Sequence, residues 1–237
     1  MQMKEKAQEW LDTAKEGNVR RRDVWFLQDV QFWPRVGYGI CCNTATHANL
    51  EKVLQKQYYQ LLPLGGVVCS APAAIRQVHR GFYGIGCTHP SVKCLTGQVG
   101  KLLMHYGCKS SVGFKMGVSF RELVLELGLT LQPFHEPFHV YKNWVTWSWM
   151  TSIWEKCSIY EVRIDILDTE LSFPRERDHW LMQLFLQLGY TPAQLEILNR
   201  VQVYQQVVFL SCILNAFGSA LDENTSIQDH TVHNGLL

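Results

Sequence analysis

Residues 47–62 read HANLEKVLQKQYYQLL, and Pro63 follows them directly. The larger apolar side chains of this stretch fall three or four positions apart, at Leu50, Val53, Leu54, Tyr58 and Leu61. That spacing gathers them on one face of an α-helix. Because a proline disfavours helical backbone in the residue before it, we expect the helix to end at Pro63.

The same periodicity predicts further helices on both sides of this one, so the sequence favours a mainly α fold. Apolar spacing and capping patterns predict helices at residues 3–16, 91–106, 119–127 (Ser119 and Glu122 as a capping box), 143–157 and 174–188, and another from Thr191-Pro192 with Gln194. We expect Trp144, Trp147 and Trp154 of the 143–157 helix to pack in or beside the core. Residues 161–166 alternate apolar with charged side chains and predict a short β element.

Glycine and proline mark the expected domain boundary. The stretch Gly81-Phe82-Tyr83-Gly84-Ile85-Gly86, followed by Pro90, is the part of the chain richest in glycine. Such punctuation is typical of a break between structured segments. We therefore expect a basic helical module at 1–86, a second helical module at 87–221, and a disordered tail at 222–237.

Composition limits the classes of protein to which the chain can belong. It has 237 residues, 47% of them hydrophobic, and no apolar run approaches the roughly 20 residues of a membrane span. The first residues lead into no apolar segment of a secretory signal. Eight cysteines in such a chain favour free, mostly buried thiols. We expect an intracellular protein, cytoplasmic or nuclear, that does not bind membranes.

Charge is divided unevenly along the chain. Residues 1–110 carry 14 Lys/Arg against 7 Asp/Glu, whereas residues 111–237 carry 8 against 14. A basic half favours contact with nucleic acid, and an acidic half favours contact with protein or solvent. Within the basic half, Arg20, Arg21 and Arg22 stand close to Trp25, Phe26, Phe32 and Trp33. Such a mixture can hold phosphates and stack on bases, but charge runs are also common on ordinary solvated surfaces.

One pattern matches the zinc-protease motif H-E-x-x-H, at His135-Glu136-Pro137-Phe138-His139. That motif requires a helix that brings both imidazoles to one face. Pro137 within the motif disfavours such a helix. We expect an extended loop with two solvent-facing histidines and no peptidase activity.

Other catalytic and metal-binding patterns are incomplete. Soft ligands gather at Cys87, His89, Cys94, His105 and Cys108, but their spacing is irregular and contains no C-x-x-C pair. The sequence also contains no G-x-S-x-G elbow and no P-loop. We therefore expect no bound metal, no cofactor and no catalytic set.

Several short segments, in order, resemble the region after the palm in the reverse transcriptases of non-LTR retroelements. Four segments resemble the thumb of these enzymes: residues 33–40, 54–59, 61–66 and 83–86. Four later segments resemble the region that follows the thumb in some retroelement polyproteins: residues 103–108, 154–156, 174–178 and 208–211. The resemblance spans about residues 23–221. It implies a helical thumb-like module without the catalytic palm, since the chain contains no Asp-Asp pair that could hold two catalytic metal ions.

This resemblance also implies roles and partners. It implies structural roles for Pro63, Gly66, Gly84 and Gly86, and template-primer contacts by Arg35, Lys52 and Lys56. The partners would be an RNA–DNA hybrid or a duplex, and an upstream palm if the chain belongs to a larger polyprotein. Together with Arg20, Arg21 and Arg22, these three basic residues are the candidate nucleic-acid-binding set. The alternative is a non-enzymatic interaction domain whose aromatic segment 143–157 packs against a partner protein.

Overall fold

The computed structural model describes residues 2–129, 132–166, 178–215 and 220; within these ranges, the side chains of residues 2–3, 37–38, 53–58, 73 and 80 are outside the description. The fold is mainly helical, as the sequence predicts. The chain divides into two compact units, residues 1–104 (unit 1) and 105–237 (unit 2). In the described part of the chain, no helix is both long and apolar enough to cross a membrane.

Unit 1 is built from the three helices that the sequence predicts and from shorter helical elements that it does not predict. Its elements are α1 (Gln2–Glu16), α2 (Arg21–Leu27), the π-helical turn η1 (Gln28–Phe32), α3 (Trp33–Ile40), α4 (His47–Leu64), α5 (Ala73–Gln77), the 3₁₀ turn η2 (Arg80–Phe82) and most of α6 (Pro90–Gly107). The helices predicted at 3–16, 47–62 and 91–106 are therefore confirmed as α1, α4 and α6. Pro63 lies inside the last turn of α4, which ends one residue after it.

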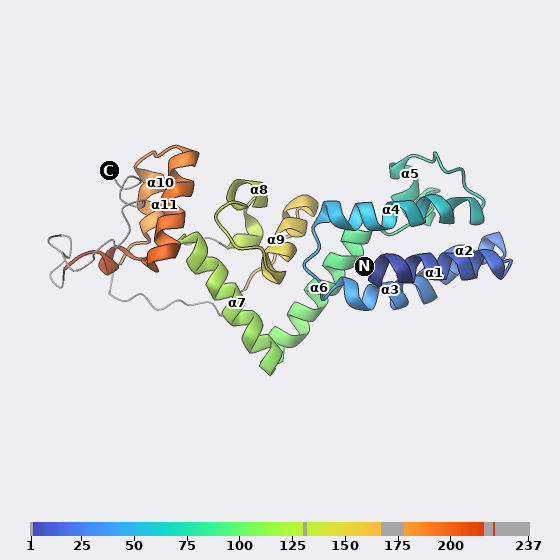
Figure 1. Cartoon of the computed structure of the whole chain (residues 1–237), viewed down its shortest axis with the longest axis horizontal. Coiled ribbons are helices and arrows are strands. Elements are labelled where there is room, and N and C mark those ends of the chain that lie inside the picture. Colours follow the sequence, from blue (N-terminus) through green and yellow to red (C-terminus); the bar gives the residue numbers. More distant parts are fainter. Residues whose placement is uncertain (1, 130–131, 167–177, 216–219, 221–237) are drawn as a thin grey trace. The chain divides into compact units, whose positions relative to one another are not determined.

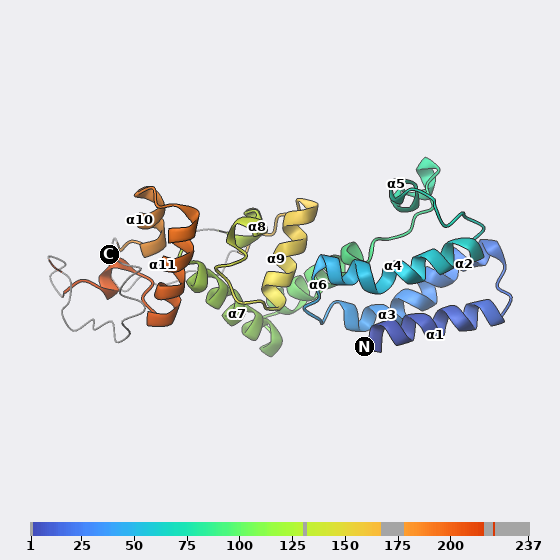
Figure 2. The ribbon, with the colours of Figure 1, turned by 45° about the horizontal axis from the view of Figure 1, so that its top comes forward.

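The core of unit 1 lies between α1, α3 and α4, which run alongside one another in Figures 1 and 2. Aromatic rings fill much of it: the ring centroids of Trp10 and Phe32 lie 5.1 Å apart, as do those of Phe32 and Trp33. The buried Cys94 ties α6 to this core by donating its S–H to the carbonyl oxygen of Ile40, at 3.2 Å.

Elements α2, η1 and α3 follow one another without a break. Five buried side chains recur every four residues, at Val24, Gln28, Phe32, Val36 and Ile40, and Trp33 is buried beside this row. A π-helical turn has more residues per turn than an α-helix. The turn at η1 therefore helps to keep this four-residue row directed at the core.

The glycine-rich stretch at 81–86 folds back within unit 1. The N–H groups of Ile85 and Gly86 donate to the carbonyl oxygens of Ile75 and Val78, at 3.0 and 2.9 Å. Two glycines of unit 1 have positive φ angles, Gly86 at 74° and Gly66, after α4, at 78°. Such angles favour glycine because it has no Cβ atom. The division between the two compact units falls between residues 104 and 105, within α6, whereas the sequence predicted a boundary near 86.

Unit 2 is also helical. Its elements are α7 (Ser111–Leu127), the 3₁₀ turn η3 (Pro133–His135), α8 (Phe138–Tyr141), α9 (Trp149–Tyr160), α10 (Leu181–Gln187), α11 (Pro192–Gln205) and the 3₁₀ turn η4 (Leu210–Cys212). Side-chain amides hold α11 against the end of α7: Asn199 donates to the carbonyl oxygen of Glu126 at 2.6 Å, and Gln202 to that of Leu125 at 3.0 Å.

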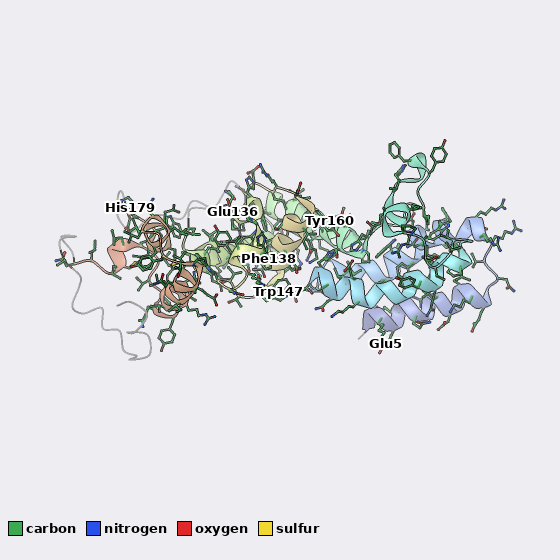
Figure 3. All side chains as sticks on the ribbon, turned by 90° about the horizontal axis from the view of Figure 1, so that it is seen from above. Glu5, Glu136, Phe138, Trp147, Tyr160 and His179 are labelled. Atoms are coloured by element: carbon green, nitrogen blue, oxygen red, sulfur yellow. The ribbon has the colours of Figure 1, made fainter. Side chains whose placement is uncertain are left out.

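An aromatic cluster forms around α9. Trp154 is fully buried and donates its indole N–H to the carbonyl oxygen of Glu136 at 2.7 Å. Its ring centroid lies 5.3 Å from that of Phe138 and 6.0 Å from that of Tyr141. Figure 3 shows Phe138 and Trp147 near each other at this cluster, with centroids 6.0 Å apart.

Two predicted helix starts in unit 2 are wrong. Helix α7 begins at Ser111 with Ser110 as its N-cap, so Ser119 lies within the helix and does not cap it. Helix α9 begins at Trp149, because Ser148 and Thr151 form a capping box at that point. Trp144 therefore precedes the helix but is buried, whereas Trp147 is 41% exposed. Trp144 and Trp154 therefore pack in the core, and Trp147 lies beside it, with its ring centroid 6.0 Å from that of Phe138.

The short strand predicted at 161–166 is also wrong. Glu161 ends α9 in the left-handed region, with a φ of 54°, and the residues after it pair with no strand among the described residues. Ile164 and Ile166 are buried and Asp165 is exposed, but Val162 is exposed as well, so burial alternates only over residues 164–166. A strand also needs a neighbour for its backbone hydrogen bonds.

Two further predictions concern the last part of the chain. The capping box of Thr191 and Gln194 at the start of α11 is confirmed. The helix predicted at 174–188 is confirmed only from Leu181, where α10 begins: residues 178–180 are described and are not helical, and residues 174–177 lie outside the described residues. The tail predicted at 222–237 lies outside them as well.

Candidate nucleic-acid interface

Three of the basic residues predicted to bind nucleic acid lie at the corner between α1 and α2. Arg20 is the N-cap residue of α2, and Arg20, Arg21 and Arg22 are all exposed. Arg22 forms a loose ion pair with Asp23, at 3.6 Å. The stem of Arg21 lies over Gly66, where a Cβ atom would be 3.1 Å from Arg21 Cδ. This corner is a solvated basic surface.

The other three predicted residues lie on α3 and α4. Arg35 donates to the Glu9 carboxylate at 2.8 Å, so an acidic neighbour on α1 offsets its charge. Lys52 is exposed on α4. The side chain of Lys56 is outside the described residues.

The six predicted residues are not gathered into one cluster. Arg21 lies beside Gly66, just past the end of α4, whereas Lys52 belongs to the second turn of that helix. At 1.5 Å per residue, the two positions are about 20 Å apart along the helix axis. The structure therefore brings Arg20, Arg21 and Arg22 together but not with Lys52.

A separate basic site lies in unit 2, where the loop after α6 meets α7. A hollow of about 240 Å³ is lined by Tyr106, Lys109, Gly113, Phe114, Gly117 and Arg121. We call it the basic–aromatic pocket. Its volume is smaller than that of most pockets for whole small molecules, which hold about 300–1,000 Å³. It has room for one ring or one anionic group.

Two glycines on one face of α7 create the hollow. At Gly113 the helix comes so close to the end of α6 that a Cβ atom would overlap the carbonyl oxygen of His105. At Gly117, one turn later, a Cβ atom would lie 3.2 Å from the ring of Tyr106. Ser110 fixes the start of α7 by accepting a hydrogen bond from the N–H of Gly113, at 3.1 Å. The pocket therefore rests on a well-defined helix start.

No described carboxylate pairs with the two cations of the pocket. Lys109 is exposed and Arg121 is half-buried, and neither forms a salt bridge with any described carboxylate. Phe114 is 68% exposed, an unusual position for a large apolar ring. Two cations beside an open aromatic ring can hold a phosphate and stack on a base.

Sequence reasoning missed this pocket. Lys109 and Arg121 are twelve residues apart and belong to a loop and a helix, so no short motif joins them. The available pattern was the pair of glycines four apart in α7, with Phe114 beside the first and Arg121 one turn after the second.

The soft ligands considered for zinc lie apart. Cys94 is buried against Ile40 in unit 1, whereas His105 Nδ1 lies 3.3 Å from the Ser110 hydroxyl in unit 2. A different group does assemble in unit 1: the ligand atoms of His47, Glu51 and His89 all lie within 4.8 Å of one another. In the part of the chain that the structure describes, no other set of three such side chains comes as close.

The H-E-x-x-H pattern does not form one helix, as predicted. His135 ends the turn η3, Glu136 is extended with φ −95° and ψ 152°, and α8 begins only after Pro137. His135 lies 3.0 Å from the carboxylate of Asp165, and His139 is exposed. The two imidazoles therefore lack the helical arrangement on which the motif depends.

Comparison with known proteins yields no relative. No protein-family model, curated protein or solved structure matches the chain.

Proposed function

We propose that this chain is a non-catalytic protein that binds nucleic acid without sequence preference, with its principal contact at the basic–aromatic pocket of unit 2. The observation that carries the proposal is the pairing of Lys109 and Arg121, two cations without a described acidic partner, with the open ring of Phe114. Phosphate contacts and ring stacking both ignore base identity. Single-stranded nucleic acid fits best, because its bases are free to stack.

The arginines at the α1–α2 corner and the exposed Lys52 supply additional electrostatic attraction. The ordered resemblance to the thumb of reverse transcriptases supports the same function, since a thumb contacts a duplex or hybrid. On this proposal, a palm that carries the paired Asp residues would be a separate partner. The chain itself contributes binding and no chemistry.

The direct test is the binding of a labelled single-stranded oligonucleotide, followed by fluorescence anisotropy at several salt concentrations. Each phosphate contact contributes a log–log salt slope of about −0.7 on a single strand. We expect the double variant Lys109→Gln/Arg121→Gln to flatten the slope by about 1.4 and to weaken binding at least about tenfold, since a hydrogen bond to a charged group contributes about 1.5–3 kcal/mol. Lys142→Gln, at an exposed lysine elsewhere in unit 2, is the matched control.

Stacking is tested separately from charge. Phe114→Ala should weaken binding about fivefold or more and leave the salt slope unchanged, because each stacked base contributes about 1–3 kcal/mol. Tyr204→Ala removes an equally exposed ring from α11 and serves as the control. Wild-type protein that does not bind at low salt, or binding that ignores all three pocket changes, would exclude the pocket as the site.

An interaction domain is the second candidate, and one observation favours it. At the turn η2, Phe82 is 77% exposed and Tyr83 is 99% exposed with a φ of 62°. Two adjacent aromatic rings in solvent are common at protein-binding surfaces. If nucleic acid does not bind and Phe82→Ser/Tyr83→Ser abolishes association with a partner protein, this candidate replaces the first.

A further inference from the structure

Three potential metal ligands meet where α4 and α6 begin in unit 1. His47 is the first residue of α4, and Glu51 follows one helical turn later, so both side chains leave the same face. The Thr46 side chain caps this helix by accepting from the N–H of Asn49 at 3.1 Å, which fixes its start. His89 immediately precedes α6.

The three side chains already lie near the separation that a metal ion requires. Glu51 Oε1 is 3.2 Å from His89 Nε2 and 3.9 Å from His47 Nε2. The two imidazole rings stack, with centroids 5.2 Å apart and an angle of 16° between their planes. Tetrahedral zinc with bonds of about 2.0–2.1 Å to nitrogen and oxygen holds its ligand atoms about 3.3 Å apart. Small side-chain rotations are sufficient to close the group.

The electrostatic setting suits a cation. Burial lowers the pKa of His89 below its ordinary value, which favours the neutral imidazole that can act as a ligand. Glu51 adds a carboxylate oxygen. Two histidines and a carboxylate form a donor set typical of zinc sites that keep one position for water.

We propose that His47, Glu51 and His89 bind one divalent transition metal ion, best matched by zinc. The site is independent of the proposed nucleic-acid contact, because it lies in the other unit and shares no residue with the basic–aromatic pocket. It also departs from the expectation of no bound metal, which rested on Cys87, His89, Cys94, His105 and Cys108. Of those five, only His89 belongs to the proposed site.

Metal binding has one structural consequence at His89. The Ser91 N–H donates to His89 Nδ1 at 3.2 Å, so without metal the ring carries its proton on Nε2, toward Glu51. Coordination through Nε2 requires the proton to move to Nδ1. The hydrogen bond from the Ser91 N–H to Nδ1 is then lost, and the new Nδ1–H needs another acceptor. A hydrogen bond from the second ring nitrogen is the usual support of a histidine ligand.

The primary experiment is zinc titration of untagged, chelator-treated protein by isothermal calorimetry. We expect one equivalent of zinc to bind the wild type. His47→Ala and His89→Ala should each weaken binding at least about tenfold, because even the loss of a group that only supports a ligand weakens binding about 10–100-fold. Glu51→Gln keeps the size of the side chain but removes its charge, and should also weaken binding. His139→Ala, which removes an exposed imidazole from unit 2, should bind like the wild type.

Two further measurements keep the test decisive. Circular dichroism without metal shows whether each variant is folded. If His89→Ala does not fold, Glu51→Gln, which keeps the size of the side chain, still tests the site. Cobalt substituted for zinc should give visible d–d absorption without a thiolate charge-transfer band. Absence of zinc binding, zinc binding that the His47, Glu51 and His89 variants leave unchanged, or a thiolate band from a neighbouring cysteine would each overturn the proposal.

Discussion

Gly113 shows how a single residue can fix local geometry. It lies on α7 where the backbone of His105 and Tyr106 comes closest, and this approach leaves no space for a side chain. The same approach forms one wall of the basic–aromatic pocket. Both the stability of unit 2 and the shape of the pocket therefore depend on a residue without a side chain at position 113.

We expect Gly113→Ala to lower the free energy of unfolding by about 1–3 kcal/mol or more, because the added methyl group must push backbone aside. Gly100→Ala is the matched control, since that helical glycine has nothing within 4 Å of its ideal Cβ position. The control should raise the free energy of unfolding by about 0.5–1 kcal/mol through helix propensity. Urea denaturation measures both, and equal effects of the two changes would contradict the structure.

The thiols differ sharply in their surroundings. Burial raises the pKa of the Cys157 thiol to about 12, whereas Cys42, Cys69, Cys108 and Cys212 are exposed. At about pH 8, a thiol reagent should modify the exposed cysteines quickly and Cys157 only after denaturation. Mass spectrometry of the modified peptides identifies which thiols react. Fast labelling of Cys157 in the native protein would show that α9 is open to solvent.

The same thiol makes stability depend on pH in the alkaline range. In the unfolded chain it loses its proton near its ordinary pKa of 9.0, whereas in the folded chain it keeps the proton up to about 12. The unfolded state therefore binds fewer protons as the pH rises above about 9, and this group makes the free energy of unfolding fall there. Urea denaturation at a series of alkaline pH values measures the change.

At the scale of the element, α9 is held by the aromatic cluster around Trp154. Trp154→Ala removes a fully buried ring and its hydrogen bond to Glu136, so we expect a loss of about 3–5 kcal/mol in the free energy of unfolding. Trp147→Ala changes a ring that is 41% exposed and should cost less than half as much. Thermal denaturation compares the two variants. Similar losses would mean that Trp147 is as deeply packed as Trp154.

Helices could be predicted from the sequence where apolar spacing and caps agree. Leu50 and Leu61 mark the buried face of α4, and Thr191 with Gln194 marks the start of α11. The start of α9 was missed because tryptophans at helical spacing continue upstream of Ser148, where the cap begins the helix. The strand at 161–166 was wrong because alternation reports which side chains are buried, not whether a second strand is present.

The candidate sites were harder to predict than the elements. His47 and Glu51 are one turn apart on a recognisable helix, but His89 follows 38 residues after Glu51 and joins them only through tertiary structure. Lys109 and Arg121, twelve residues apart, likewise line one pocket only because the loop before α7 and the helix itself lie close together. Conversely, the family resemblance added Arg35 to the same candidate set as Arg20, although Glu9 pairs with Arg35. Sequence patterns identify ligand types, but folding decides which of them meet.

At the scale of the whole molecule, charge divides with the two units. Unit 1 contains 13 Lys/Arg against 7 Asp/Glu, and unit 2 contains 9 against 14. The pocket cations Lys109 and Arg121 therefore belong to the acidic unit. The bases of a duplex are paired and stacked on one another, so they are less free than those of a single strand to stack on the ring of Phe114. We infer that the basic surface of unit 1 matters most for duplexes.

This division leads to a prediction for a duplex or an RNA–DNA hybrid. If Lys52 and Lys56 each contact one phosphate, Lys52→Glu/Lys56→Glu should flatten the log–log salt slope by about 1.8 and weaken binding. Anisotropy with a labelled hybrid measures the slope, and a reversed charge at Lys142 (Lys142→Glu) controls for net charge. If the hybrid's slope does not respond to the Lys52 and Lys56 changes, these lysines are not part of the interface.

The π-helical turn at η1 has a consequence for how this chain can change over generations. A row of side chains repeated every four residues advances about 40° per step around an ordinary α-helix, or about 160° from Val24 to Ile40. The wider turn at Gln28–Phe32 opposes that drift. Loss of one residue there would rotate everything beyond it by about 100° and turn Trp33 and Val36 away from their neighbours. We therefore expect single substitutions in this segment to be tolerated more readily than any change in the number of residues between Val24 and Ile40.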